Sequence, residues 1–334
     1  MSKVSVLIAI YNSEKYLAEC LDSVCSQTLS DIQIICIDDC STDSSPAIIA
    51  DYAQKDKRIH VIRLSENRGT AYARNMGLSM ANGEYTMMLD SDDWLDVDAL
   101  ERAYRMVSVD ETIDCGVLRL VYFYEEEQRF EPYRNKTALT EFTGEDAFLL
   151  SLDWSLHGLY MVRTSIHKEY PYDTSCRLYS DENTTKLHYL HSRRIVLTDG
   201  AYYYRQHGTS QTNRHSILRF DRMEACLSLK KMLISEAAND AFSNSEKVID
   251  GYECYRWLNI VDAYWYYYCH QTCFTLEQCS EIESRIASML LTVERHRIPW
   301  SLKLKLGYYP FKSYQCFSKT ANFYFALRRL LGRN

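Results

Sequence analysis

The sequence predicts an α/β fold with a mainly parallel central sheet flanked by helices, followed by a helical C-terminal region. Over the first third of the chain, short apolar runs of strand length alternate with longer segments of helical period, which is the pattern of βαβ units. From about residue 215 the pattern becomes helical and aromatic, as in Tyr264-Trp265-Tyr266-Tyr267-Tyr268. Where the period changes, we place a boundary between residues 1–212 and residues 213–334.

Apolar runs define the strands expected in the N-terminal region. They are Val4–Ile10, Ile32–Ile37, His60–Leu64 and Tyr85–Leu89, with further strand-like stretches at Cys115–Tyr124 and Ile195–Tyr204. Helical periods predict a helix capped by Ser13 with an apolar stripe from Tyr16 to Val24, one through Ile48, Ile49 and Tyr52, one over Thr70–Met80, and one from Val97 to about Met106. The acidic stretch Ser180-Asp181-Glu182 opens a later helix.

Charge is unevenly distributed along the chain. The formal net charge is −7 over 334 residues, which argues against a nucleic-acid partner, because proteins that coat a duplex present a broad excess of positive charge. Residues 297–334 contain no acid and eight cations, namely Arg297, Lys303, Lys305, Lys312, Lys319, Arg328, Arg329 and Arg333. This segment therefore has a charge of +8, and residues 1–296 have a charge of −15.

The twelve cysteines are scattered without a CxxC pair or a framework of close, repeating spacings. The N-terminal sequence MSKVSVLIAIYN has no long apolar stretch before a cleavage site, so it looks like neither a signal peptide nor a membrane-spanning helix. We therefore expect reduced thiols and a cytoplasmic location. Buried cysteines such as Cys36 are expected to serve as small apolar side chains.

Polar and acidic residues follow each of the four expected strands. The strand ends read Tyr11-Asn12, Asp38-Asp39, Ser65-Glu66-Asn67 and Asp90-Ser91-Asp92-Asp93. Since ligands of open α/β sheets bind beyond the carboxyl ends of the strands, these side chains are candidates for one site. The first strand is followed by Tyr11-Asn12-Ser13-Glu14 in place of a glycine-rich loop, which disfavours both a dinucleotide fingerprint and a phosphate-binding P-loop.

The segment Asp90-Ser91-Asp92-Asp93 is the strongest local signal in the sequence. Three carboxylates within four residues repel one another unless a positive charge neutralises them. Hard oxygen ligands of this kind suit Mg²⁺ or Mn²⁺ shared with a diphosphate. The alternative is structural, with Asp92 or Asp93 capping the helix that follows and interacting favourably with its dipole.

Five short motifs between Ile8 and Asp93 resemble those of the inverting family 2 glycosyltransferases with the GT-A fold. They are Ile8-Ala9-Ile10-Tyr11-Asn12, Ile37-Asp38-Asp39-Cys40-Ser41-Thr42-Asp43, Glu66-Asn67-Arg68-Gly69, Ala73-Arg74-Asn75-Met76-Gly77 and Leu89-Asp90-Ser91-Asp92-Asp93. A later match consists of Asp181, a helical segment, Ile195 and the run Tyr204-Arg205-Gln206-His207-Gly208-Thr209-Ser210. The resemblance implies a nucleotide-sugar-binding and catalytic domain of the bacterial polysaccharide or glycoconjugate type over residues 1–212.

The resemblance also implies roles at the donor site. Tyr11 would lie against the nucleobase, Asp39 would accept a hydrogen bond from the base, and Arg74 would lie near the pocket floor or the phosphates. Asp90 would hold the ribose or belong to the surroundings of the metal. The further residues expected to contact the nucleotide sugar are Ala9, Asn67, Ser91 and Arg205.

Mn²⁺ or Mg²⁺ is the cofactor that the resemblance implies. Asp92 would bind the cation that bridges the diphosphate, with Asp93 as a substitute or an outer acid. His207 is a further candidate ligand, and Arg205 could meet the diphosphate with its fork of donors. The alternative for Arg205 and His207 is a surface pair without a role in the site.

The general base would remove a proton from the acceptor hydroxyl, a contribution of roughly 10²–10⁴-fold to the rate. The resemblance implies Asp181, because the spacing back from Ile195 and Tyr204-Arg205 favours it, and Glu182 is the alternative. In a third interpretation, both acids are only N-terminal residues of a helix and are stabilised by its dipole.

Two positions depart from the family pattern. Ala9 stands where the family usually has Pro before the Tyr-Asn pair, so we expect a less rigid first loop. Cys40 stands where the family usually has Gly, and a cysteine disfavours the positive φ that glycine allows.

Together these features predict an inverting, metal-dependent glycosyltransferase. It would move a sugar from a nucleotide sugar, expected to be a UDP-sugar, to a hydroxyl of a glycan or lipid-linked glycan. A cation would stabilise the charge on the leaving diphosphate. The alternative is a non-catalytic scaffold on a glycosyltransferase fold, but retention of the whole acidic set argues against it. A nucleotidyltransferase is disfavoured because no Gly- and Arg/Lys-rich loop follows the first strand.

The basic C-terminal segment is also aromatic. Its nine aromatic residues are Trp300, Tyr308, Tyr309, Phe311, Tyr314, Phe317, Phe323, Tyr324 and Phe325. Such a segment suits an anionic membrane surface, which would place the protein at the inner face of the cell membrane. In the alternative, the aromatic residues pack on the catalytic domain and the cations pair with its acidic surface. The aromatic helix over 252–269 offers a homo-oligomer surface as readily as a core.

Overall fold

The computed structural model describes residues 2–134, 136–174, 179–207, 215–239 and 241–331. The chain folds as two compact units, residues 1–210 and residues 211–334. The boundary that the sequence predicts at residue 212 lies outside the described residues. The same holds for Gly208, Thr209 and Ser210, which end the later match, and for Arg333 in the basic segment.

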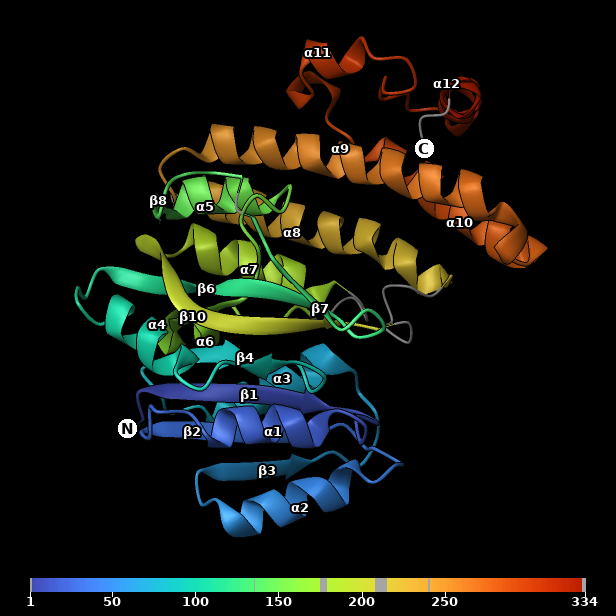
Figure 1. Cartoon of the computed structure of the whole chain (residues 1–334). Helices are drawn as coiled ribbons and strands as arrows, with labels where there is room; N and C mark the ends of the chain where they lie inside the picture. Colours follow the sequence, from blue (N-terminus) through green and yellow to red (C-terminus); the bar gives the residue numbers. More distant parts are fainter. Residues whose placement is uncertain (1, 135, 175–178, 208–214, 240, 332–334) are drawn as a thin grey trace. The chain divides into compact units, whose positions relative to one another are not determined.

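The first unit has the α/β composition that the sequence predicts (Figure 1). Its strands are β1 (Val4–Ile10), β2 (Ile32–Asp38), β3 (Ile59–Arg63), β4 (Tyr85–Met88), β5 (Trp94–Leu95), β6 (Ile113–Tyr124), β7 (Arg129–Pro132), β8 (Glu141–Thr143), β9 (Tyr160–Arg163) and β10 (Arg194–Gln206). Its helices are α1 (Leu17–Cys25), α2 (Ser45–Lys55), α3 (Thr70–Met80), α4 (Ala99–Val107), α5 (Gly144–Ser151), α6 (Thr164–Glu169) and α7 (Ser180–Leu190).

The central sheet is mainly parallel, as predicted. Its strand order is β3-β2-β1-β4-β9-β6-β10-β5, with β7 paired to β6 and β8 paired to β10. Strands β3, β2, β1 and β4 are parallel neighbours, and so are β6 and β10. Strand β9 is antiparallel to both β4 and β6, so it lies as an inverted strand between the two parallel groups.

Helices cover both faces of the parallel strands, which explains why β1 and β2 read as continuous apolar runs. On one face, the side chains of α1 that include Leu21 and Val24 pack with Val6 and Ile8 of β1. On the other face, Ala73 and Leu78 of α3 pack with Leu7, Ile35 and Ile37. Figure 1 shows α1 in front of the sheet and α3 behind it.

The first helix begins later than predicted, and Ser13 does not cap it. Helix α1 starts at Leu17 with Tyr16 at the N-cap position and no capping side chain. The hydroxyl of Ser13 instead lies 2.7 Å from the hydroxyl of Ser91, in the loop after β4. The capping prediction is therefore wrong, because a partner distant in sequence takes the hydroxyl that would have capped the helix.

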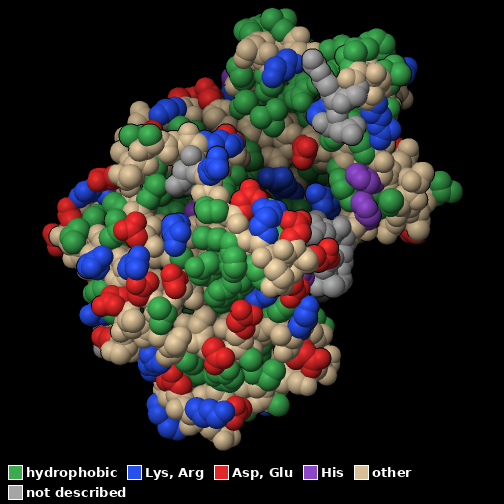
Figure 2. Space-filling model, in the orientation of Figure 1, with side chains coloured by type: hydrophobic (Ala, Val, Ile, Leu, Met, Phe, Trp, Pro, Cys, Tyr) green, Lys and Arg blue, Asp and Glu red, His purple; other side chains and the backbone are tan. Residues whose placement is uncertain are grey.

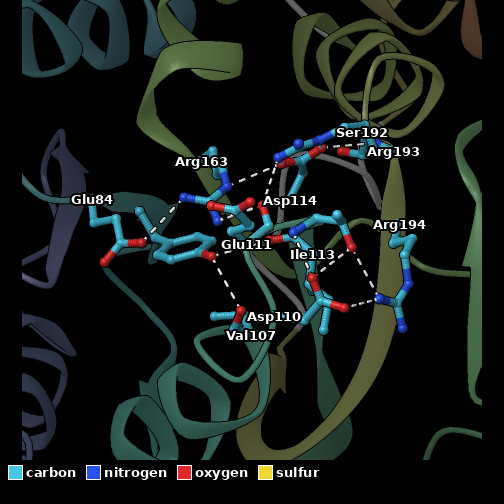
Figure 3. Close-up of polar contacts among 12 residues, drawn as sticks. Glu84, Val107, Asp110, Glu111, Ile113, Asp114, Arg163, Ser192, Arg193 and Arg194 are labelled. Carbon is cyan, nitrogen blue, oxygen red and sulfur yellow. Dashed lines mark hydrogen bonds and ion pairs between the residues drawn. The ribbon is translucent and has the colours of Figure 1, made fainter.

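A polar network joins the amino-terminal ends of β6 and β10 to the carboxyl end of the antiparallel strand β9 (Figure 3). Its centre is the buried carboxylate of Asp114. Asp114 accepts hydrogen bonds from Arg163 Nε (3.0 Å), from the backbone N–H of Arg193 (2.8 Å) and from Arg193 Nη2 (2.7 Å). Arg163 also pairs with Glu84 at 3.1 Å, next to the start of β4. One carboxylate thus joins three strands at this edge.

We expect Asp114→Asn to lower the free energy of unfolding by about 2 kcal/mol, because an amide cannot accept at both of its terminal atoms. Urea denaturation followed by circular dichroism measures the loss. The matched control is Glu141→Gln, which changes an exposed carboxylate that contacts Arg194 at 2.7 Å, and we expect less than about 1 kcal/mol there. Equal losses in the two variants would contradict a special role for Asp114.

The second unit is helical. Its α-helices are α8 (Asp221–Ala237), α9 (Ser245–His270), α10 (Leu276–Leu291), α11 (Trp300–Lys303) and α12 (Tyr314–Leu330). In the described part of this unit, short 3₁₀ helices lie at Ile217–Phe220, Gln271–Cys273 and Arg295–Arg297. Among the described residues, no helix combines the length and the apolar character that crossing a membrane requires.

The aromatic residues of α9 belong to the core of the second unit. Tyr252, Trp257, Tyr264 and Tyr267 are all buried. Trp257 and Tyr264 pack against Phe317 with ring centroids 5.7 and 5.1 Å apart. Of the two interpretations of this helix, the structure supports a core for these four residues.

Most aromatic residues of the basic segment also belong to this core. Phe317 and Phe325 are buried in it, and Tyr308, Phe311, Tyr314 and Tyr324 pack against it. Arg297 forms ion pairs with Glu246 (2.7 Å) and Glu294 (2.9 Å) of the same unit. The sequence analysis offered the alternative that the aromatic residues pack on the catalytic domain and the cations pair with its acids. For the residues named here, the structure shows the ring packing and the ion pairs within the second unit.

Candidate active site

Hydrogen bonds join the carboxyl ends of β1, β2 and β4. Asn12, which follows β1 with φ at 50°, accepts a hydrogen bond at Oδ1 from the backbone N–H of Thr42 at 2.8 Å. The backbone N–H of Asn12 donates to Ser41 Oγ at 3.0 Å. Together with the Ser13–Ser91 contact, these bonds bring three strand ends to one edge. Ser91 is buried there, with its hydroxyl committed to Ser13.

Asp39 fixes the loop after β3 to the end of β2. It is buried, and its two carboxylate oxygens accept the backbone N–H groups of Arg68 (2.7 Å) and Gly69 (2.8 Å). The Asn67 side chain donates to the backbone oxygen of Asp39 at 3.3 Å. A carboxylate has about four acceptor positions, so Asp39 keeps capacity for a ligand.

Cys40 adopts the left-handed conformation in spite of its side chain, with φ at 62°. Its thiol donates to the backbone oxygen of Ser65 at 3.7 Å. The turn that glycine usually allows in the family pattern is therefore kept by a cysteine, at a steric cost of about 1 kcal/mol. The loop geometry after β2 overrides the local preference of the residue.

Tyr11 lies at the open side of the same edge. It directly follows β1, and 47% of its surface is exposed. Ala9, two residues earlier on β1, is half-buried. An exposed aromatic ring beside buried acceptors is a suitable wall for a flat, polar-edged ligand such as a nucleobase.

Arg74 and Asp90 form the central ion pair of the site. Arg74 is buried on α3, and its Nη2 lies 2.6 Å from Asp90 Oδ1. Its guanidinium also lies over the ring of Tyr172, 5.2 Å from the centroid. Burial opposes the charge of Arg74, but the carboxylates of Asp90 and Asp181 outweigh it and raise the pKa of Arg74. The cation is therefore fixed between two acids.

Asp92 is the outward-facing acid of the segment after β4. Its side chain is 39% exposed, and its Oδ2 lies 3.0 Å from Nε2 of His207. His207, just after β10, is largely covered, and its ring lies 5.1 Å from that of Tyr16. The sequence treated these two residues as separate candidates, and the structure brings them together.

Asp93 faces inward, away from this pair. It is buried, and its oxygens accept hydrogen bonds from the hydroxyl of Tyr202 (2.8 Å) and from the backbone N–H of Arg205 (2.8 Å). Burial, together with the charges of Asp90 and Asp92, raises the pKa of Asp93 well above its usual range. Because its carboxylate is buried, the role of an outer acid fits Asp93 better than the role of a substitute for Asp92.

Arg205 is enclosed by protein groups on all sides that the structure describes. Its Nε donates to the backbone oxygen of Asp92 at 2.9 Å, and its Nη2 pairs with Glu19 of α1. The guanidinium lies over the rings of Tyr16 and Trp94, 4.7 and 4.6 Å from the centroids. Arg205 thus holds the backbone of Asp92 in position, and its contact with the diphosphate stays a prediction.

Asp181 and Glu182 lie in the first turn of α7. Asp181 is half-buried beside Tyr160 and Tyr172, with which it lines a small cavity next to β4. Burial raises its pKa, and the cation of Arg74 partly opposes that increase. Glu182 differs, since its carboxylate lies 3.6 Å from Lys186 one turn along the helix.

Four tyrosines that the sequence analysis did not single out extend from the acidic centre. This aromatic strip consists of Tyr204 on β10, Tyr122 and Tyr124 on β6, and Tyr133 just after β7. The ring of Tyr122 lies 6.0 Å from Tyr204, 6.4 Å from Tyr124 and 6.3 Å from Tyr133. All four are half-buried. The strip depends on the register that pairs Tyr204 with Tyr122, so no local signal could have found it.

The described residues do not form a complete metal site by themselves. Among residues 2–134, 136–174, 179–207, 215–239 and 241–331, no group of three or more His, Cys, Asp and Glu side chains is arranged to hold a metal ion. Asp92 and His207 fit a partial site, because Mg²⁺ is usually bound through one or two carboxylates plus substrate phosphates and Asp92 supplies such a carboxylate. The 3.0 Å between the two donor atoms is close enough for both to face one cation.

Comparison with known sequences places this site in a family. The model of glycosyl transferase family 2 matches residues 5–170. Glycosyltransferase GlyG of Streptococcus pneumoniae is 30% identical over 221 residues, which cover 62% of this chain and 72% of GlyG. The chain belongs to glycosyltransferase family 2. The assignment to family 2 that the five sequence motifs predicted is thereby confirmed.

A further relative of the family 2 chain is much longer. Glycosyltransferase GlyA of Streptococcus pneumoniae is 39% identical over 128 residues, which cover 38% of this chain and 18% of GlyA. The chain therefore spans a small part of GlyA.

Solved structures share the fold of this family 2 chain. S. aureus TarS 1-349 in complex with UDP-GlcNAc superposes with a TM-score of 0.77 at 20% identity, covering 96% of this chain and 91% of that chain. Mannosyltransferase PcManGT from Pyrobaculum calidifontis, in complex with GDP-Man and Mn²⁺, has a TM-score of 0.52 at 17% identity, covering 99% of this chain and 88% of that chain. The GT-A fold predicted from the sequence is confirmed.

Proposed function

We propose that this chain is an inverting, metal-dependent glycosyltransferase that moves a sugar from a UDP-sugar to a hydroxyl of a glycan. The observation that supports it most is the arrangement of acids at one sheet edge. Asp90 is paired to the buried Arg74, Asp92 faces outward beside His207, and Asp181 is half-buried close enough to Arg74 to affect its pKa. These three acids have separate environments, which suits three separate tasks.

The nucleoside part of the donor is assigned to the ends of β1 and β2. Tyr11 offers an exposed ring for stacking on the base, and Asp39 offers its remaining acceptor positions to the base N–H. Ala9 and Asn67 form the adjoining wall. TarS, which shares the fold, has been solved with both UDP and UDP-GlcNAc, and this supports a UDP-sugar as the donor here.

Asp92 and His207 are the residues proposed to hold Mn²⁺ or Mg²⁺, with Asp90 behind them. The Mn²⁺ complex of PcManGT supports a divalent cation. When bound, the ion would neutralise the negative charge that grows on the diphosphate as the glycosidic bond breaks. Arg205 keeps Asp92 in position through its hydrogen bond to the backbone oxygen of Asp92, and Arg74 keeps Asp90 in position through their ion pair.

Asp181 is the proposed general base. Its carboxylate takes the proton from the acceptor hydroxyl while that oxygen attacks the anomeric carbon. A single displacement of this kind inverts the anomeric centre, so an α-configured UDP-sugar should give a β-linked product. Glu182 is less suited, because its carboxylate lies 3.6 Å from the buried Lys186 and is therefore less available to an acceptor hydroxyl.

The aromatic strip supports a carbohydrate acceptor. Its first ring, Tyr204, is half-buried, and burial, together with the nearby charges of Asp90 and Asp181, raises its pKa. Tyr204 is therefore near both the proposed donor-site residue Asp90 and the proposed base Asp181. Aromatic rings with a polar edge can pack on the apolar face of a pyranose and bond its hydroxyls. We therefore assign the acceptor sugar to the side of the site formed by Tyr204 and Tyr122.

A thermal melt with nucleotides tests the donor and the metal together. We expect UDP with Mn²⁺ to raise Tm, because a ligand at 100 times its Kd stabilises the folded state by about 2.7 kcal/mol. Stabilisation by GDP or dTDP in the absence of any effect of UDP would contradict the donor assignment. A panel of UDP-sugars with NMR of the product then tests inversion, since an α-linked product would overturn it.

We expect Asp92→Asn to remove most of the Mn²⁺-dependent part of the UDP stabilisation, because the variant loses one negatively charged ligand atom. The melting temperature without ligand should change little, since the Asp92 side chain is exposed. The control is Asp51→Asn, an exposed acid of α2 that pairs with Lys55. Unchanged Mn²⁺ dependence in Asp92→Asn would contradict the proposed metal ligand.

A further inference from the structure

Helix α12 has two apolar faces on opposite sides. The inner face consists of Phe317, Ala321 and Phe325, which are buried in the core of the second unit. The outer face consists of Phe323, Leu327 and Leu330, spaced by four and three residues, and these side chains are 64%, 40% and 84% exposed. A helix that only covered a core would need one apolar stripe. The second stripe is covered by nothing that the structure describes.

Helix α11 adds a second exposed apolar group in the same segment of the chain. Trp300 is 69% exposed and Leu304 is 79% exposed. The ammonium of Lys303 lies over the indole ring of Trp300, 4.7 Å from its centroid. An amphipathic ring beside a lysine is typical of side chains that lie at the level of lipid headgroups.

The charged side chains of the segment that carries these apolar groups are all positive. No acid occurs between residues 298 and 334. Two cations of the segment are used internally, since Arg297 pairs with Glu246 and Lys312 donates to the backbone oxygens of Leu291 and Val293. Figure 2 shows green and blue side chains side by side over α11 and α12.

Four other cations make no ion pair with an acid in the part of the chain that the structure describes. They are Lys303, Lys305, Lys319 and Arg329. Lys319 lies one turn before Phe323 on the outer face of α12. The outer face of α12 and the exposed side chains of α11 therefore combine apolar area with uncompensated positive charge.

We propose that the outer face of α12, with Trp300 of α11 and Leu304 directly after α11, docks on the surface of an anionic lipid bilayer. Charge complementarity selects this occupant. A second copy of the chain would set one positive face against another, whereas anionic headgroups would neutralise both helices and the apolar side chains would enter the boundary with the acyl chains. The proposal is independent of the proposed transfer reaction, since it concerns a surface of the second unit.

Sedimentation of the 334-residue chain with vesicles tests the proposal. We expect binding to phosphatidylcholine vesicles that contain about 30% phosphatidylglycerol and little binding to pure phosphatidylcholine, since each cation near an anionic surface strengthens binding about fivefold. Binding should weaken at about 0.5 M NaCl, because salt screens exposed charges. Equal binding to the neutral and the anionic vesicles would overturn the proposal.

Two variants separate the apolar and the charged contributions. The triple substitution Phe323→Ser, Leu327→Ser and Leu330→Ser should reduce vesicle binding about tenfold or more with Tm nearly unchanged, because these side chains are exposed. The triple substitution Lys303→Glu, Lys305→Glu and Lys319→Glu should reduce it about 100-fold or more. The control is Leu276→Ser, an equally exposed leucine at the start of α10, which should bind as the unchanged chain does.

Three results would contradict the proposal. One is that the triple serine variant of α12 and the control Leu276→Ser both bind vesicles as strongly as the unchanged chain does. Another is unchanged vesicle binding in the triple glutamate variant. This variant keeps the apolar face of α12, so it still tests the proposal if the serine variant does not fold. The third is a dimer in analytical ultracentrifugation that the serine variant converts to a monomer, which would assign the outer face to a second copy.

Discussion

Substitution of Asp181 by asparagine should lower the rate of sugar transfer by about 10²–10⁴-fold, because the amide cannot accept the proton of the acceptor hydroxyl. Binding of UDP with Mn²⁺ should stay close to that of the unchanged chain, since the proposed donor contacts come from the ends of β1, β2 and β4. Transfer is measured as release of UDP in the presence of a glycan acceptor, and donor binding by the thermal melt. The matched control is Glu182→Gln, the next acid of the same helical turn.

The same variant should also melt at a higher temperature than the unchanged chain at neutral pH. Burial raises the folded-state pKa of Asp181, so its ionisation opposes folding. When the pKa of a carboxyl group is higher in the folded state than in the unfolded state, protonation of that group stabilises the folded state. This stabilisation is complete at a pH below the unfolded-state pKa, and it is lost as pH rises through the folded-state pKa. The gain from Asp181→Asn should therefore be present at pH 7 and disappear toward the ordinary pKa of an aspartate. A lower Tm at pH 7 would contradict the buried position of this acid.

The pH profile of transfer follows from the same shift. A general base works only when it is deprotonated, so kcat/KM should fall on the acidic side as pH drops through the pKa of Asp181. Because burial raises that pKa above the ordinary value of an aspartate, the fall should occur at a higher pH than an exposed aspartate would give. If Glu182→Gln abolishes transfer and Asp181→Asn leaves it unchanged, the base is Glu182.

The first half of the fold could be predicted because its signals are local. Strand β1 has the predicted bounds, since every residue of Val4–Ile10 belongs to an apolar run covered by helices on both faces. Helix α3 spans Thr70–Met80 as predicted. Gly69 precedes it with φ at 87°, and the chain turns through Ala81-Asn82-Gly83 after it, so both ends are encoded by adjacent residues.

The orientation of the site acids could not be predicted, because partners distant in sequence decide it. Asp92 and Asp93 are neighbours with the same side chain, yet Asp93 turns inward to Tyr202 and the backbone of Arg205, both more than 100 residues later. In the same way, Ser13 leaves the helix cap for Ser91. The motif places three acids at a strand end, and only the packing of β10 against that end tells them apart.

The surroundings of Arg205 could not be predicted either, because they also depend on residues distant in sequence. Its position next to a tyrosine-rich strand predicted a phosphate ligand, since an arginine fork suits phosphate oxygens. The residues that enclose it come from two different places in the first hundred residues, namely Tyr16 and Glu19 at the start of α1 and Trp94 in β5.

Substitution of Arg74 by methionine should lower the free energy of unfolding by about 3 kcal/mol, because it removes the buried partner of an ion pair and leaves carboxylates uncompensated. Methionine keeps most of the apolar volume, so the loss reports charge more than packing. Urea denaturation at pH 7 measures it. The matched control is Arg68→Met, an exposed arginine of the preceding loop that pairs with Glu66, for which we expect less than about 1 kcal/mol.

A double variant distinguishes the lost charge from lost packing. If Arg74 acts mainly by neutralising Asp90, then adding Asp90→Asn to Arg74→Met should restore part of the lost stability, with a coupling of about 1–3 kcal/mol. The loss should also shrink as pH falls, since Arg74 lowers the pKa of Asp181 and protonated carboxyl groups no longer need a cation. Additive effects of the two substitutions, or a loss that does not change with pH, would mean that Arg74 supports the site through its contact with Tyr172 instead.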